Sequence, residues 1–246
     1  MTQPQRPKFT DTPEAWAAFE TAYATWEQSP EGHAELANER AAETRKRQEV
    51  QAAYEENRAA AVDRLLESIA LPERALGVVL AGKLQVTEAL SAADTVPDLL
   101  VLSGGAGCGK TVAAVAWVVG YVRDPANWLQ EGRAARFKSR PPIWVTAAKL
   151  ARWERYDEDK MADLLRTPRL VVDDLGGEYM DQRGFYASLF DEIVNERQAA
   201  SRPTILTTNL GAEAFKTRYG DRIVDRIREG GRFINCGNKS LRTQAA

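Results

Sequence analysis

The chain has 246 residues, of which 44% are hydrophobic and 28% are charged, so it can bury one substantial core and carry a small appendage. This composition excludes collagen-like, low-complexity and wholly disordered chains. No segment approaches the roughly 18 to 20 apolar residues of a membrane-spanning helix, and residues 1–10 lack a basic segment followed by an apolar run. We therefore expect a cytoplasmic protein without a membrane partner.

Charge is unevenly distributed along the chain. Residues 1–70 hold 13 acidic and 8 basic residues, a net charge of −5, whereas the remainder carries +3. This split predicts two parts with different partners, an acidic N-terminal region over residues 1–70 suited to a protein and a body over residues 71–246 that can approach nucleic acid. The helices described next make the N-terminal region helical.

The first expected helix begins at Thr12 and Pro13, an N-cap residue followed by proline at the first helical position, and ends near Gln28. Four aromatic residues recur within it at helical spacing and share one face. They are Trp16, Phe19, Tyr23 and Trp26. This face is either the packed interior of a small helical domain or a docking surface for a helix of a partner.

Residues 33–70 are rich in Ala, Glu, Arg and Gln, which predicts one long helix of roughly 55 Å. Between residues 37 and 61 only Val50 and Tyr54 are sizeable apolar residues. A helix so polar on every side buries little, so we expect it to bridge two parts of the chain through solvent.

From residue 99 onward, short apolar runs alternate with amphipathic segments, a pattern typical of a parallel sheet covered by helices. The expected strands are 99–103, 143–146, 170–173, 204–207 and 233–236. The expected helices are 110–122, 149–165, 184–199 and 211–229. The fold class is therefore α/β.

A phosphate-binding loop stands between the first expected strand and the helix that follows it. The motif G-x-x-x-x-G-K-T comprises Gly104, Gly105, Ala106, Gly107, Cys108, Gly109, Lys110 and Thr111. Glycines let successive backbone amides point at phosphate oxygens, and the helix N-terminus adds a positive dipole. Lys110 would reach the outer phosphates of ATP or ADP, and the Thr111 hydroxyl would bind Mg²⁺.

Two later strands end in polar side chains. Asp173 and Asp174 follow an apolar strand, as in a Walker B element, and we expect Asp173 to hold Mg²⁺ and Asp174 to orient or deprotonate the attacking water. Asn209 ends the next β-prone run, where its amide can bridge the γ-phosphate and that water.

The order of these motifs over residues 71–242 resembles the AAA+ ATPases of the DnaC and IstB type. The resemblance implies a five-stranded parallel sheet of order 5-1-4-3-2, no separate lid domain, and a sensor 1 role for Asn209. It also implies that Arg226 is an arginine finger for the next subunit, with Arg222 beside it, so that the protein self-associates. The terminal Ser-x-Arg makes Arg242 a candidate sensor of the nucleotide.

Two points leave alternatives open. Arginines at this spacing would also form ordinary ion pairs with the acidic residues of their own helix. The catalytic position holds Asp174, where replicative loaders often have Glu and IstB-like proteins often have Asp. We therefore expect slow hydrolysis, and the residue leaves the subfamily open.

A basic and aromatic segment follows the second expected strand and can contact single-stranded DNA. Its residues are Lys149, Arg152, Trp153, Arg155 and Tyr156. The alternative is an amphipathic helix with Leu150 and Trp153 in the core.

Together these features predict an ATP-dependent helicase loader, whose N-terminal region binds a replicative ring helicase and whose ATPase domain delivers it to single-stranded DNA. An IstB-like transposition helper acting on duplex DNA, a nucleotide-gated binding module with negligible turnover, and a small-molecule kinase remain as alternatives.

Overall fold

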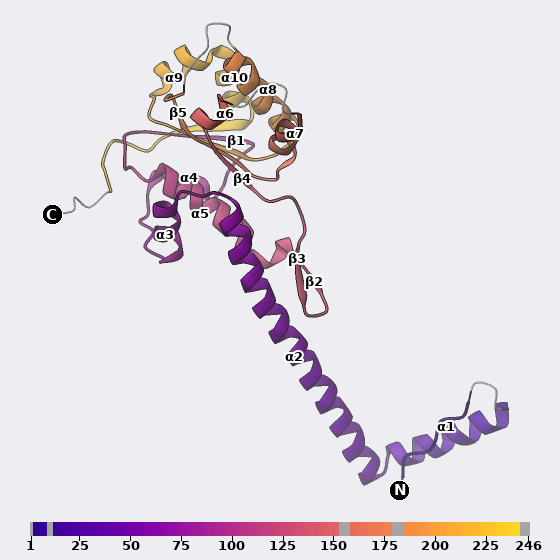
Figure 1. Ribbon diagram of the computed structural model, residues 1–246. Coiled ribbons are helices and arrows are strands. Elements are labelled where there is room, and N and C mark those ends of the chain that lie inside the picture. Colours follow the sequence, from indigo (N-terminus) through magenta and orange to yellow (C-terminus); the bar gives the residue numbers. More distant parts are fainter. Residues whose placement is uncertain (1, 9–11, 153–157, 179–184, 242–246) are drawn as a thin grey trace. The chain divides into compact units, whose positions relative to one another are not determined.

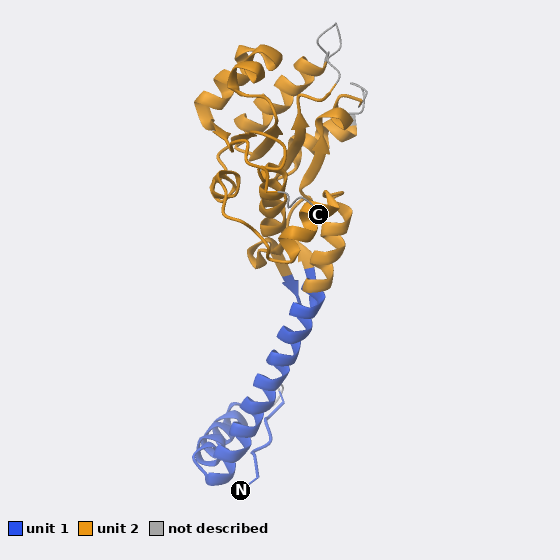
Figure 2. Cartoon of the chain, turned by 90° about the vertical axis from the view of Figure 1, so that its left-hand side faces the viewer, with its two compact units in different colours: residues 1–58, 130–135 blue, residues 59–129, 136–246 orange. Residues whose placement is uncertain are grey.

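The computed structural model describes residues 2–8, 12–152, 158–178 and 185–241. The chain forms two compact units, one of residues 1–58 with 130–135 and the other of residues 59–129 with 136–246 (Figure 2). These units are defined by contacts within the chain. The domain boundary at residue 70, which is inferred from composition, stays a prediction.

In the first unit, helix α1 (Pro13–Glu27) begins where the sequence predicts, with the Thr12 hydroxyl accepting a hydrogen bond from the Ala15 amide at 3.4 Å. The four aromatic rings of its stripe contact one another in series, with centroids 6.3, 5.6 and 5.3 Å apart. Trp26 is buried, and the other three rings are half-buried. The extended segment before α1 contributes to this face, since the Arg6 guanidinium lies over the Trp16 ring.

The long polar helix is α2 (Pro30–Ser68), which has 39 residues (Figure 1). It begins three residues before the expected start because the Ser29 hydroxyl accepts from the Gly32 amide at 3.0 Å and so caps the new helix. A Cβ at Gly32 would lie 2.0 Å from the Trp26 carbonyl oxygen, so the tight turn between α1 and α2 requires glycine there. No helix within the described residues combines the length and apolarity needed to cross a membrane.

The second unit is built on a five-stranded sheet in which every neighbouring pair is parallel. The strand order is β4-β5-β6-β1-β7, which, counted along these five strands from the β7 edge, is the predicted 5-1-4-3-2. The α/β fold class is confirmed. The strands are β1 (Leu99–Ser103), β4 (Ile143–Thr146), β5 (Leu170–Leu175), β6 (Thr204–Thr208) and β7 (Gly231–Asn235).

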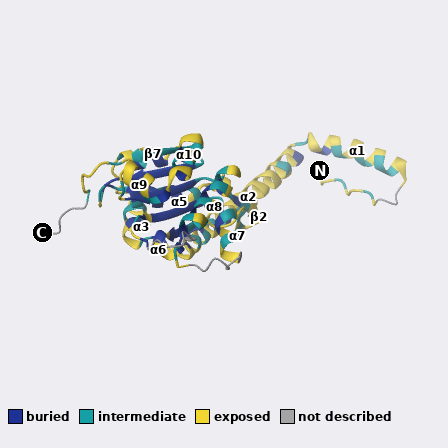
Figure 3. Cartoon of the chain, turned by 90° about the horizontal axis from the view of Figure 1, so that it is seen from above, coloured by how far each residue is buried: buried dark blue, intermediate teal, exposed yellow. Residues whose placement is uncertain are grey.

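Helices cover both faces of this sheet (Figure 1), and the strands between them form the buried centre of the unit (Figure 3). β1 and β6 are buried at every residue, because strands covered on both sides have no polar face. One face carries α3 (Glu73–Leu80), α4 (Glu88–Ala93) and α5 (Lys110–Arg123). The other carries α6 (Ala147–Leu150), α7 (Glu158–Arg166), α8 (Phe185–Ala199), α9 (Ala212–Tyr219) and α10 (Asp221–Gly230).

Two of the expected helices differ from the structure. The helix expected over 211–229 is divided into α9 and α10 at Gly220, whose φ of +85° lies in the left-handed region that ends a helix. The helix expected over 149–165 is represented by α6 and α7, and residues 153–157 lie outside the described residues. Helix propensity is similar on both sides of each break, so propensity does not predict where these helices end.

Several short elements are absent from the sequence analysis. They are α3, α4, the turn η1 (Pro125–Asn127) and a hairpin of β2 (Trp128–Glu131) and β3 (Ala134–Phe137). Each is too short to show a clear period in the sequence.

A buried arginine joins the segments that precede β5 and β6. Arg197 of α8 is fully buried and donates hydrogen bonds to the Thr204 hydroxyl and to backbone carbonyls at the ends of neighbouring segments. These carbonyls belong to Leu164, Thr167, Pro203 and Arg202, at 2.6 to 3.4 Å. Carbonyl dipoles thus solvate the guanidinium, and burial lowers its pKa to about 9.

Candidate nucleotide-binding site

The predicted phosphate loop lies between β1 and α5. Lys110, the first residue of α5, is almost buried, and its ammonium donates to the carbonyls of Gly104 and Gly105 at 2.7 and 2.9 Å. It also donates to the Asn209 side-chain oxygen at 3.1 Å and approaches the Cys108 sulfur at 3.6 Å. Every hydrogen-bond partner that the structure gives this cation is uncharged.

Neutral hydrogen-bond acceptors compensate only part of the hydration energy that an enclosed cation loses. Such a cation can therefore gain free energy by binding an anion. The loop also presents the N-terminus of α5, where Gly109 adopts a left-handed φ of +98° as the N-cap. Helix N-termini attract anions through their free amides and dipole. The loop is therefore complementary to a phosphate group.

The segment that follows β7 packs against the phosphate loop. The Gly105 amide donates to the Gly237 carbonyl at 2.9 Å, and the Leu241 amide donates to the Gly107 carbonyl at 2.9 Å. A Cβ at Gly104 would lie 2.5 Å from the Gly237 oxygen, so this close approach requires glycine. Arg242, the predicted sensor, lies outside the described residues, but its neighbour Leu241 contacts the loop.

The predicted magnesium ligands come together at the carboxyl ends of the strands. One oxygen of Asp173 accepts from the Thr207 hydroxyl at 2.5 Å and from the Thr111 hydroxyl at 3.3 Å. Burial raises the pKa of Asp173, while the two hydroxyl hydrogen bonds oppose this effect. A buried carboxylate beside a threonine hydroxyl is a suitable donor set for a hard cation such as Mg²⁺.

Asp174 lies where the strand β5 is irregular. β5 continues to Leu175, two residues beyond the predicted end, with a bulge between Val172 and Leu175. Asp174 has a left-handed φ of +62° and is exposed, and its amide donates to the Thr207 hydroxyl at 2.9 Å. The Asn209 amide group donates to the Asp174 carboxylate at 3.4 Å, so Asn209 links Asp174 to Lys110.

Arg226, the predicted arginine finger, lies away from this site. α10 leads into β7, and Gly231 at the start of β7 pairs with Leu99 at the start of β1. The carbonyl of Arg226 accepts from the side chain of Gln198 near the end of α8, which precedes β6. Arg226 is thus at the amino ends of the strands, whereas the phosphate loop is at the carboxyl ends.

Within the chain these arginines form ion pairs. Arg226 pairs with Glu229 at 2.9 Å, and the highly exposed Arg222 pairs loosely with Asp191 at 3.6 Å. Arg228 on the same helix pairs with Asp225. Such exposed pairs contribute little stability, so an assembly could replace them at small cost.

The basic segment after β4 is only partly described. Leu150 is buried in the core, while Lys149 and Arg152 are exposed. Trp153, Arg155 and Tyr156 lie outside the described residues.

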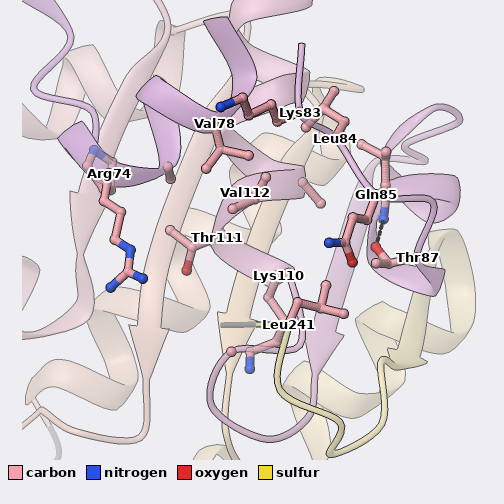
Figure 4. A pocket seen from close by; sticks show the side chains of 16 residues that line it. Arg74, Val78, Lys83, Leu84, Gln85, Thr87, Lys110, Thr111, Val112 and Leu241 are labelled. Atoms are coloured by element: carbon pink, nitrogen blue, oxygen red, sulfur yellow. Dashed lines mark hydrogen bonds between the residues drawn. The ribbon is translucent and has the colours of Figure 1, made fainter. Parts of the chain in front are cut away.

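A pocket beside the phosphate loop escaped the sequence analysis. It has a volume of about 480 Å³ and lies between α3, α4 and α5 (Figure 4). Its described lining includes three cations, Arg74, Lys83 and Lys110, and no carboxylate. Val78, Leu84 and Leu90 add apolar surface. The helix-start residues Pro72 and Thr87, which precede α3 and α4, are the sequence signals that could have revealed these walls.

These features define a P-loop nucleotide-binding protein. The first strand of a parallel sheet leads through a glycine loop into a helix, and a lysine, a threonine and an acidic strand end converge at that loop. Residues 35–246 match the family described as IstB-like ATP binding protein, and the chain belongs to that family. The predicted resemblance to ATPases of the DnaC and IstB type is thereby confirmed.

Among curated proteins, the chain is 30% identical over 169 residues to the uncharacterized protein YdaV of Escherichia coli strain K12. The match covers 63% of this chain and 62% of YdaV, so the chain spans about three-fifths of that relative. Among solved structures it is similar to that of the DnaC helicase loader, with 20% identity and a TM-score of 0.45 over 60% of this chain and 85% of the chain in that structure. It is also similar to the structure of DnaI, with 19% identity and a TM-score of 0.49 over 68% of this chain and 95% of the chain in that structure.

Proposed function

We propose that this protein binds ATP with Mg²⁺, hydrolyses it slowly in an assembly of its own copies, and uses this cycle to deliver a ring helicase to single-stranded DNA. The observation that carries the nucleotide part is the nearly buried ammonium of Lys110, whose described hydrogen-bond partners are all neutral.

The residues present fit a magnesium nucleotide. Lys110 and the loop amides would hold the phosphates, and Thr111 and Asp173 would hold the metal ion. The pocket beside the loop has room for the nucleoside, with apolar walls for a base and with Lys110 where the pocket meets the phosphate loop. A bound Mg²⁺ would neutralise charge on the phosphate oxygens.

The proposed roles in hydrolysis follow from the hydrogen bonds at the strand ends. Asp174 is exposed beside the loop and accepts from Asn209, so the two can orient a water molecule, and the Asp174 carboxylate can accept its proton. The planar guanidinium of Arg226 from a neighbouring copy would stabilise the charge that spreads over the transferring phosphoryl group.

This division of labour between copies is testable by mixing. An Arg226→Ala subunit should bind ATP normally but hydrolyse it roughly 100-fold more slowly. Mixing it with a Lys110→Met subunit, which supplies Arg226 but lacks the phosphate lysine, should restore activity at the interfaces where an intact loop meets an intact arginine. Arg228→Ala, which removes an exposed arginine from the same helix, serves as the control. Well-folded variants that regain no activity on mixing would exclude the finger.

The helicase part of the proposal rests on the aromatic face of α1. Three rings of this face are half-buried rather than enclosed, in a region of net negative charge, which suits an amphipathic helix of a partner protein.

Co-purification with a replicative ring helicase tests this surface on the full chain. Phe19→Ala should lower recovery of the helicase at least about tenfold, because aromatic anchors carry much of the affinity of such contacts. Glu20→Ala, on the neighbouring exposed position, should leave recovery unchanged. Equal recovery with both variants would remove the aromatic face as the docking site.

A second function is favoured by the family match itself, whose description is IstB-like. In that case the protein is a transposition helper that acts on duplex DNA. ATPase assays separate the two: stimulation by single-stranded DNA supports the loader, stimulation by duplex DNA supports the helper, and binding without turnover supports a nucleotide-gated module. Phosphorylation of a small acceptor independent of Arg226 would instead indicate a kinase.

A further inference from the structure

The loop after β5 contains a carboxylate that the roles above leave unused. The side chain of Glu178 has no solvent exposure. One of its oxygens accepts from the Tyr219 hydroxyl at 2.6 Å and from the Arg218 guanidinium at 3.1 Å, and the other accepts from the Gly176 amide at 2.7 Å. Four residues after Asp174, a fully enclosed acid therefore joins its own loop to the end of α9.

These contacts keep Glu178 charged. Burial alone would raise its pKa, but hydrogen bonds from Tyr219, from the backbone and from Arg218 outweigh burial, and the pKa is lowered. Arg218 also donates to the backbone carbonyl of Glu178 at 2.5 Å. Both the side chain and the main chain of Glu178 are thus anchored on the last turn of α9.

The loop that Glu178 anchors has an unfavourable backbone. Asp174 occupies the left-handed region at φ +62°, which costs a non-glycine residue about 1 kcal/mol, and Gly176 follows at φ +109°. The amide of Asp174 is held by Thr207 on β6, and the amide of Gly176 is held by the Glu178 carboxylate. The strained residue is therefore fixed on both sides, and such strain persists only where the surroundings impose it.

We propose that Glu178 is a positioning residue for Asp174. By holding the Gly176 amide and by being held on α9, it keeps the bulge in the conformation that directs the Asp174 carboxylate toward Asn209 and the phosphate loop. Because Gly220 follows α9 and begins α10, the same anchor connects this loop to the helix that carries Arg222 and Arg226. This inference rests on the proposed hydrolytic function of Asp174.

The test compares Glu178→Gln with the wild-type chain in two ways. Without nucleotide, hydrogen–deuterium exchange of residues 174–178 should become at least about tenfold faster, while exchange of β1 stays unchanged. With ATP, kcat should fall about tenfold, whereas KM and the dissociation constant for ATP should stay within about twofold, because the phosphate lysine and its loop are untouched.

A control separates positioning from general loss of stability. Arg197→Met removes the buried guanidinium at the amino ends of the strands and should lower the melting temperature without changing exchange at residues 174–178. In an Asp174→Asn background, Glu178→Gln should have no further effect on kcat, because Glu178 acts through that carboxylate.

The outcomes are distinct from those that test the proposed function. If the wild-type chain hydrolyses ATP and Glu178→Gln leaves both the exchange and kcat at wild-type values, the positioning role is wrong. A wild-type chain that binds but never hydrolyses ATP contradicts the hydrolytic function, and the positioning role falls with it even where exchange shows the anchor to be real.

Discussion

Replacement of Lys110 by Met is expected to weaken ATP binding by about 100-fold, equivalent to about 2.7 kcal/mol. Met preserves the length and apolar stem of the side chain and removes only the ammonium group. That group is the charged centre of the loop, and its described hydrogen bonds go to uncharged oxygens and a sulfur. Its charge is therefore available to a ligand.

Isothermal titration with ATP and Mg²⁺ measures this effect. Lys149→Met, at an exposed position after β4, is the matched control and should retain wild-type affinity. Thermal melts without nucleotide check that the Lys110→Met variant is folded under the conditions of the titration. Undiminished ATP affinity in a folded Lys110→Met protein would contradict the assignment of the site.

Replacement of Asp173 by Asn is expected to lower ATP hydrolysis without lowering the stability of the fold. Asn retains the side-chain oxygen that accepts from Thr207 and Thr111 but lacks the charge that burial disfavours. The variant should melt at or above the wild-type temperature at pH 7.5. Magnesium-dependent hydrolysis should fall by roughly 100-fold or more, since a neutral amide is a poor ligand for Mg²⁺.

The pH dependence of this stability difference has a definite sign. Because the pKa of Asp173 is raised in the folded chain, the folded state binds more protons than the unfolded state between the two pKa values, and the stability of the wild-type chain falls as pH rises through that window. The advantage of Asp173→Asn should therefore be largest above the window and shrink as pH falls. Melting curves from pH 4 to 8 without nucleotide or metal measure it, and a variant clearly less stable at pH 7.5 would show that the charge stabilises the fold.

The phosphate loop was predictable because its chemistry is local. Its glycines, Lys110 and Thr111 lie within eight residues, and the apolar run before them is recognisable as a buried strand from its composition. Asp173 was predictable for a related reason. The end of an apolar strand next to such a loop falls at the sheet edge where ligands bind.

The positions of other residues depend on segments far apart in the chain. The pocket beside the loop needs α3, α4 and α5 to meet, and each of the first two is too short to show a period. The arginines of α10 fit both an ion-paired surface and a finger in the sequence. Only the direction of that helix places Arg226 at the end of the sheet opposite the phosphate loop.

The sequence by itself determined that a phosphate loop is followed by an acidic strand end in a parallel α/β domain. Glycine conformations, strand apolarity and helix capping each act over a few neighbouring residues, so they can be recognised locally. The tertiary structure decided that Asp174 lies in a bulge of β5 with a left-handed backbone and that Glu178 is enclosed against α9. Burial and hydrogen bonding between residues some 40 positions apart depend on which segments of the chain meet. Patterns of neighbouring residues do not specify these long-range contacts.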